Sequence, residues 1–189
     1  MRNTVIYIIG LVGVGKYTIA KELETLGDFR VIGNHLINNV IFPVARKDGI
    51  TPLPQEVWSY TKKIRDVFLE AFQNIRVKDA NFVFTNALAD NDKGDMEIYE
   101  SVRCAAENSG ASFFPVRVLV DKEENRKRIM SVERELRFKQ TSDNQLDKLY
   151  EEVEILKTGH KNEYSLDVTK LSAAEAAQQI LDHVKSKVQ

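Results

Sequence analysis

Residues 4–23 read TVIYIIGLVGVGKYTIAKEL and decide the fold. Their apolar run at 5–9 is typical of a buried strand, and Ile19 and Leu23 fall on one face of a helix after the glycine-rich turn. The turn has the spacing G-x-x-x-x-G-K and ends in Lys16. Strand, glycine-rich turn and helix in this order predict a phosphate-binding loop, because backbone N–H groups, the helix N-terminus and the lysine ammonium converge on one anion.

One position departs from this motif. A serine or threonine normally follows the lysine, and its hydroxyl meets Mg²⁺. This chain has Tyr17 there, and Thr18 comes one residue late. The strand and helix around the turn still favour a nucleotide phosphate site over an incidental glycine-rich turn. The candidate nucleotide-binding residues are Gly10, Gly13, Val14, Gly15, Lys16, Tyr17 and Thr18.

Length and composition indicate one ordinary globular domain over residues 1–189, since 43% of the residues are hydrophobic and 29% are charged. A formal net charge of −1 gives no overall attraction to nucleic acid or to a membrane surface. Apart from the apolar run at 5–9, which the glycine-rich turn interrupts, no apolar stretch approaches membrane-spanning length. The single cysteine, Cys104, cannot form an internal disulfide, which is consistent with the reducing environment of the cytoplasm. Because it lies among Val102, Ala105 and Ala106, Cys104 is predicted to be a small core residue.

Strand and helix patterns alternate along the chain five times. Such alternation predicts an α/β fold with a parallel sheet, helices on both faces and right-handed crossovers. The later strands are expected at 29–32, 81–85, 112–120 and 164–168, and the later helices at 55–77, 95–108, 143–158 and from 172.

The second predicted strand leads into the polar segment GNHLINNV, residues 33–40. Asn34, His35 and Asn38 could satisfy loop backbone groups, as asparagines near turns usually do. Amides and an imidazole after a buried strand also suit a hydroxylated ligand. Both interpretations stay open. On the helix at 55–77, Arg65 is either a solvated arginine or a clamp on an anionic substrate group, and Trp58 is a further candidate substrate contact.

Charged residues gather after the third and fourth strands. Asp90 opens an acidic run of the kind that mostly starts helices, and Asp121 begins a D-x-x-E capping box rather than a metal site. Residues 126–139 carry six basic side chains against two acidic ones. A charge run is usually a solvated helix face, but Arg134 and Arg137, three apart, would share one face and could close on a polyphosphate.

Taken together, the chain resembles the P-loop small-molecule kinases, a group that includes adenylate, shikimate and gluconate kinases. The resemblance is carried by the phosphate loop, the polar segment and helix after strand two, the arginine-rich stretch, and the closing LDVTKLSAAEAAQQIL. It implies a three-layer α/β/α P-loop fold with a five-stranded parallel sheet in the order 2-3-1-4-5. It also implies a substrate-binding insertion at about 33–78 and a lid at about 125–142 within the single domain.

The resemblance further implies transfer of the γ-phosphate of ATP to a small-molecule acceptor, with ATP and Mg²⁺ as cofactors. Lys16 would bind the phosphates, and Arg134 and Arg137 would clamp them. Related kinases that act on hydroxyl acceptors usually carry an aspartate after strand two. This chain has Gly33-Asn34-His35, which leaves His35 as the nearest candidate base and Asp90 as the second.

Two features oppose efficient transfer, namely Tyr17 and the missing aspartate. Mg²⁺ commonly keeps several waters, so it could be held through the phosphates, and no residue is assigned as its ligand. The expected function is therefore an ATP-dependent phosphotransferase acting on a hydroxylated metabolite, a nucleoside or nucleotide, or an antibiotic. The alternative is an ATP-binding regulatory module with weak or no transfer. The expected partners are ATP and the acceptor, without nucleic acid or membrane, in a monomer or homodimer.

Overall fold

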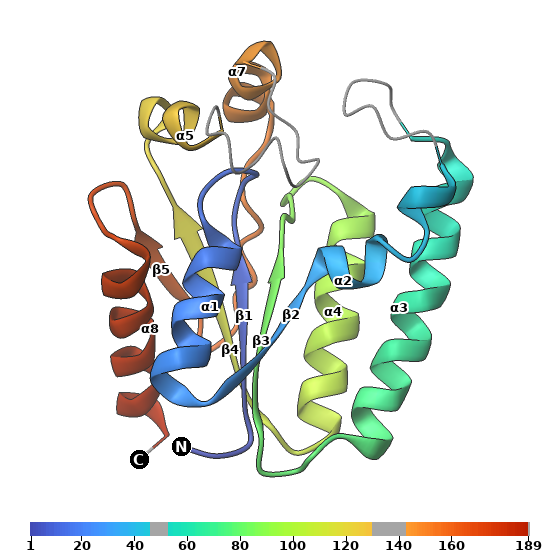
Figure 1. Cartoon of the computed structure of the whole chain (residues 1–189), viewed down its shortest axis with the longest axis vertical. Helices are drawn as coiled ribbons and strands as arrows, with labels where there is room; N and C mark the ends of the chain where they lie inside the picture. The colour runs from blue at the N-terminus through green and yellow to red at the C-terminus, as the bar shows by residue number, and fades with distance from the viewer. Residues whose placement is uncertain (46–52, 130–142, 189) are drawn as a thin grey trace.

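The computed structural model of the chain describes residues 1–45, 53–129 and 143–188. A five-stranded sheet forms its centre in the order β2-β3-β1-β4-β5 (Figure 1). Every neighbouring pair of strands is parallel, which confirms the predicted order and pairing. The strands are β1 (Thr4–Ile9), β2 (Phe29–Gly33), β3 (Asn81–Asn86), β4 (Ser112–Leu119) and β5 (Tyr164–Asp167).

Helices cover both faces of this sheet (Figure 1). Helices α1 and α8 pack together on one face, and α3 and α4 pack together on the other, while α5 and α7 lie beyond the carboxyl ends of the strands. All six residues of β1 are buried because the strand is central and covered on both sides. The helical segments are α1 (Lys16–Gly27), α2 (Asn34–Asn38), η1 (Phe42–Val44), α3 (Gln55–Ile75), α4 (Lys93–Asn108), α5 (Lys122–Ile129), α7 (Asp143–Glu152) and α8 (Ala173–Lys187).

Side-chain caps start three of these helices. Asp92 accepts hydrogen bonds from the N–H groups of the first turn of α4. Asp121 accepts from Glu123 and Glu124, so it starts α5 as the sequence predicts. Ser172 and Glu175 form the predicted reciprocal capping box of α8.

The helix predicted at 143–158 is too long. Helix α7 ends at Glu152, and the next residues run beside the end of β3, where Ile155 forms an antiparallel bridge with Ala89. The N–H of Leu156 donates to the carbonyl of Leu88, 3.0 Å away. These partners lie far away in sequence, so tertiary hydrogen bonds override the local helical periodicity.

Two smaller expectations are also corrected. Cys104 is exposed, because Val102, Ala105 and Ala106 share the inward face of α4 and residue 104 points the other way. The polar segment after β2 is not a loop at its start: Asn34 begins the short helix α2 immediately after the strand ends at Gly33.

The carboxyl ends of the strands meet at the edge of the sheet that α2, α5 and α7 surround, opposite the two chain termini (Figure 1). In open α/β sheets this edge is where ligands bind. Among the described residues, no helix is both long and apolar enough to cross a membrane.

Candidate functional site

The phosphate loop joins β1 to α1. Gly13 and Gly15 have φ angles of 97° and 93°, a left-handed conformation that costs glycine little and other residues more. Gly15 is the N-cap of α1, and Lys16 is the first helical residue. The loop therefore curls over the N-terminus of a helix, which is the geometry that binds anions.

The ammonium of Lys16 is held within this loop. Its Nζ donates to the carbonyl oxygens of Gly10 and Leu11, at 2.8 and 2.7 Å. Both carbonyls belong to the turn that begins the loop, so the lysine folds back over it. A phosphate that enters the loop meets a positive charge that is already in place.

Helix α5 packs directly against the loop. A Cβ added to Gly13 would collide with Oδ1 of Asn125 and would lie 2.6 Å from Cγ1 of Ile129. The side chain of Asn125 is fully buried, and its Nδ2 donates to the carbonyl of Val12 at 3.0 Å. The glycine at position 13 thus allows the close approach of a helix as well as the left-handed turn.

Arg128 connects the loop to the segment after β5. Its guanidinium donates to the carbonyls of Val14, at 3.3 Å, and Val168, at 3.0 Å, and its Nε contacts Glu124. Sequence reasoning missed this residue and favoured the later arginines of the same basic stretch. The only available signal was its place in the R-K-R triplet, which does not tell which arginine faces the loop. Arg126 instead contacts Glu123 and Asp147.

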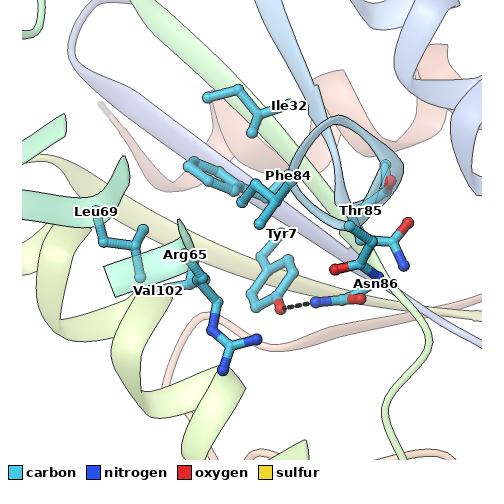
Figure 2. Close-up of a pocket in the computed structure, with 11 residues that line it drawn as sticks. Tyr7, Ile32, Arg65, Leu69, Phe84, Thr85, Asn86 and Val102 are labelled. Carbon is cyan, nitrogen blue, oxygen red and sulfur yellow. Dashed lines mark hydrogen bonds between the residues drawn. The ribbon is translucent and has the colours of Figure 1, made fainter. Parts of the chain in front are cut away.

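A narrow cavity of about 20 Å³ lies at the same edge, between α2, α3 and the ends of β2 and β3 (Figure 2). This volume has room for a water-sized group such as one end of a ligand. Polar and apolar side chains share its wall: Tyr7, Ile32, Asn34, Ile37, Asn38, Arg65, Leu69, Phe84, Thr85, Asn86 and Val102.

Arg65 brings a positive charge to this cavity from α3 (Figure 2). Its Nε is buried and has no hydrogen-bond partner among the residues that the structure describes. The neighbouring Tyr7 hydroxyl accepts a hydrogen bond from Nδ2 of Asn86 at 3.1 Å, and burial raises the pKa of Tyr7, so the phenol stays neutral. A partly buried guanidinium with an unpartnered buried Nε, beside the neutral Tyr7 phenol and the Asn86 amide, favours an anionic ligand group.

Asp95, in the first turn of α4, interacts electrostatically with this arginine. Its Oδ2 accepts from the N–H of Ala89 at 2.8 Å. Burial raises the pKa of Asp95, and the Ala89 hydrogen bond and the charge of Arg65 only partly oppose that rise. The sequence placed this residue in an acidic run of helix-starting residues, with no signal for its proximity to Arg65.

A wider cavity of about 280 Å³ lies between β4 and α7 and touches Leu11 and Val14 of the loop. Its two cations make contacts within the protein: Arg117 donates to the carbonyl of Ile155 at 3.2 Å, and Lys157 pairs with Glu154 at 3.2 Å. The Nε of Arg117 is buried without a hydrogen-bond partner among the described residues, as that of Arg65 is, but the carboxylate of Glu154 also lines this cavity. Its larger volume therefore comes with weaker chemistry for an anion than the Arg65 cavity offers.

Some of the predicted substrate and catalytic residues line the Arg65 cavity, others are exposed outside it, and two lie outside the described residues. Asn34, Asn38 and Arg65 line one cavity. His35 and Trp58 are exposed and are not part of that lining, and the Trp58 ring packs edge-on against Phe42 with 5.7 Å between centroids. Asp90 is exposed, and its Oδ1 accepts from the N–H of Lys157 at 2.9 Å, which fixes the segment after α7. Arg134 and Arg137 lie outside the described residues and stay predictions.

Tyr17 brings an aromatic ring to the position where the motif normally has a short hydroxyl side chain. Its ring lies next to Gly33, where an added Cβ would be 3.5 Å from Cδ2 of Tyr17. Among the described residues, no group of three or more His, Cys, Asp or Glu side chains is arranged to hold a metal ion. With an aromatic ring at position 17 and no side chain at Gly33, these two residues do not fit direct ligation of Mg²⁺.

Among the comparisons with known proteins, only the comparison with solved structures gives matches. No family model matches the sequence, and no curated protein matches it. Gluconokinase from Sinorhizobium meliloti aligns with a TM-score of 0.62 at 13% identity, covering 97% of this chain and 93% of that one. Shikimate kinase from Acinetobacter baumannii, solved with shikimate, aligns at 0.54 and 19%, covering 97% and 94%. APS kinase from Mycobacterium tuberculosis, solved with AMPPNP and APS, aligns at 0.54 and 15%, covering 97% and 98%. The chain therefore has the fold of the P-loop small-molecule kinases, as its sequence predicts.

Proposed function

We propose that this chain is an ATP-dependent phosphotransferase that moves the γ-phosphate of ATP to a small hydroxylated acceptor. The observation that carries the proposal is the pairing of two sites at one edge of the sheet. A phosphate loop with Lys16 at the start of α1 lies on the same edge as a cavity that holds the partly buried guanidinium of Arg65. The shared fold with gluconokinase and shikimate kinase supports it.

On the donor side, the loop N–H groups and Lys16 bind the phosphates of ATP. Phosphoryl transfer asks for positioning and charge neutralisation more than for covalent chemistry by the protein. Arg128 ties the loop to the segment after β5 and so holds the loop in shape. Arg134 and Arg137 add cations from the predicted lid at about 125–142.

On the acceptor side, Arg65 binds an anionic group, and the amides of Asn34 and Asn38 bind hydroxyls. The cavity has room for the anionic end alone, so the reacting part of the acceptor lies outside it, toward the phosphate loop. His35, at the start of α2, is the candidate base, with Asp90 second.

A screen for acceptor-dependent ADP release tests the proposal. Purified protein is mixed with ATP, Mg²⁺ and a panel of sugars, sugar acids, nucleosides, nucleotides and hydroxylated antibiotics. At least one compound is expected to raise ADP release above the rate without acceptor, and mass spectrometry should find that compound phosphorylated. ATP binding by calorimetry without turnover of any compound would contradict the proposal.

That contradicting result would instead support a regulatory module that binds ATP without efficient transfer. One observation favours this second function: the corner where such a fold would place a metal-ligating hydroxyl holds Tyr17 against Gly33. The same measurements separate the two functions, because a regulatory module binds ATP and gives no phosphorylated acceptor.

Replacing Arg65 with glutamine tests the acceptor side. We expect the KM for the acceptor to rise about 10- to 100-fold, since hydrogen bonds to charged groups contribute about 1.5–3 kcal/mol. The KM for ATP should change less than about twofold, because Arg65 lines the acceptor cavity and the phosphate loop lies apart from it. Steady-state kinetics with each substrate varied in turn measure both constants.

Lys63→Gln is the matched control, because Lys63 is an exposed cation on the same helix and contacts only the ring of Tyr60 among the interactions seen. Its kinetics should equal those of the unmodified protein. An equal rise of both KM values in Arg65→Gln would remove Arg65 from the acceptor site.

A further inference from the structure

Helix α3 carries a stripe of exposed residues along its outer side. The helix forms the right-hand edge of the molecule in Figure 1. Its buried residues face the rest of the fold and are Val57, Thr61, Leu69 and Phe72. The exposed residues that we call the α3 stripe are Tyr60, Lys63, Val67, Glu70 and Asn74. They follow one another at alternating steps of three and four, which aligns them on the side of the helix opposite the buried residues.

The α3 stripe has an apolar residue at its centre. Val67 is 65% exposed, and Tyr60, two turns earlier, is 53% exposed. Single exposed apolar side chains are normal on a protein surface, so their exposure alone does not indicate a partner. The charges on either side of Val67 do, because neither is matched within the chain.

Glu70 lies one turn after Val67 and has no ion-pair partner among the described residues. A helix can place a cation three or four residues from a glutamate, on either side. Around Glu70 these positions hold no cation and are Asp66, Val67, Gln73 and Asn74. The carboxylate is therefore left to solvent or to another molecule.

Lys63 lies one turn before Val67 and is in the same situation. At a spacing of three or four residues it has one acidic neighbour, Asp66, but that carboxylate already pairs with Lys62 at 2.6 Å. The Lys63 ammonium instead lies over the ring of Tyr60, 5.0 Å from its centroid. The α3 stripe thus carries a positive charge before its centre and a negative charge after it.

A second copy of α3, antiparallel to the first, supplies the missing partners. A two-fold axis through Val67 places a residue before Val67 in one chain beside the residue equally far after it in the other. Lys63 then lies opposite position 71, within reach of the partner's Glu70 along its flexible four-carbon side chain. Tyr60 lies opposite the partner's Asn74, where a phenol and an amide can hydrogen-bond. A parallel pair would instead bring like charges together.

We propose that this chain forms a homodimer through the α3 stripe, with two antiparallel copies of α3 crossing at Val67. One pair of helices buries less surface than a standard interface of about 1,200–2,000 Å², so the dimer is weak, with a Kd in the micromolar range. Arg65 reaches its cavity from the opposite side of α3, toward the ends of β2 and β3. The dimer therefore leaves that cavity open, and the inference does not depend on the proposed phosphotransfer.

Analytical ultracentrifugation of the full chain tests the dimer, at protein concentrations that span the micromolar range. Unmodified protein is expected to pass from monomer to dimer as its concentration rises. Lys63→Glu faces the partner's Glu70 with a like charge, and Glu70→Lys does the same to the partner's Lys63. Because the two-fold axis repeats each contact, either change should raise the Kd about tenfold or more.

Mixing the two single variants gives the sharpest measurement. One chain then carries two acidic residues at positions 63 and 70, and the other carries two basic ones, so both contacts pair opposite charges again. The equimolar mixture should associate with a Kd within about threefold of that of unmodified protein, although neither variant does so alone. The double variant Lys63→Glu with Glu70→Lys should also recover the dimer.

Lys62→Glu is the matched control, because it changes the net charge of the same helix equally at an exposed lysine outside the α3 stripe. It should leave the Kd within about twofold. Circular dichroism confirms that each variant is folded. A monomer at every concentration would overturn the inference, as would a dimer that Lys62→Glu weakens as much as Lys63→Glu, or a mixture that fails to recover association.

Discussion

Lys16→Ala is expected to abolish measurable transfer and to weaken ATP binding strongly. The ammonium of Lys16 donates to the carbonyls of Gly10 and Leu11, beside the N-terminus of α1. Removing a preorganised charge that stabilises the transferring group costs about 10²–10³ in kcat, and the loss of ground-state phosphate contacts adds to it. Calorimetry with ATP and the ADP-release assay measure the two effects.

Lys21→Ala is the control for this change. Lys21 lies in the same helix, one turn further along, and pairs with Glu24 on the surface. Its loss removes one positive charge from α1 without touching the loop. Urea unfolding of both variants shows whether either change also alters stability. Unchanged turnover in Lys16→Ala would remove the phosphate loop from the mechanism.

The sequence predicted the features that follow from local pattern. The buried run of β1 and the spacing of the loop glycines located the phosphate loop, and strand–helix alternation with the family resemblance gave the strand order that the sheet has. Capping at Asp121 and Ser172 was also predictable, because a cap depends on residues within one helical turn.

Features that depend on long-range contacts were not predictable in this way. Arg128 reaches Val14 and Val168 from a stretch in which several arginines look alike. The segment after α7 leaves the helical state because its partners come from the end of β3, more than sixty residues earlier in the chain. A single sequence contains the side chains but does not show which of them the fold brings together.

Tyr17 and Gly33 illustrate the same limit at the candidate site. Tyr17 departs from the kinase pattern at the metal-binding hydroxyl, and Gly33 belongs to the stretch Gly33-Asn34-His35, in which the usual aspartate is missing. In the structure the two positions are neighbours, since an added Cβ at Gly33 would lie 3.5 Å from Cδ2 of Tyr17. Neither position alone indicates that the fold brings the two together.

The two loop glycines allow a second prediction with a large effect, this time on stability. Gly13 and Gly15 share nearly the same left-handed φ, so an alanine at either position carries a similar backbone cost of about 1–2 kcal/mol. Their surroundings differ. An alanine Cβ at 13 meets Asn125 and Ile129 of α5, whereas at 15 the nearest atom is Nη1 of Arg128, 3.9 Å away.

Gly13→Ala should therefore lower the free energy of unfolding by about 2–5 kcal/mol, the sum of the backbone cost and an overpacking cost of about 1–3 kcal/mol. Gly15→Ala should lower it by the backbone cost alone. Urea unfolding of both variants and of the unmodified protein, followed by circular dichroism, measures the difference. Equal destabilisation would mean that α5 yields without cost, and the close packing of Asn125 against the loop would then play no part in holding the phosphate site in shape.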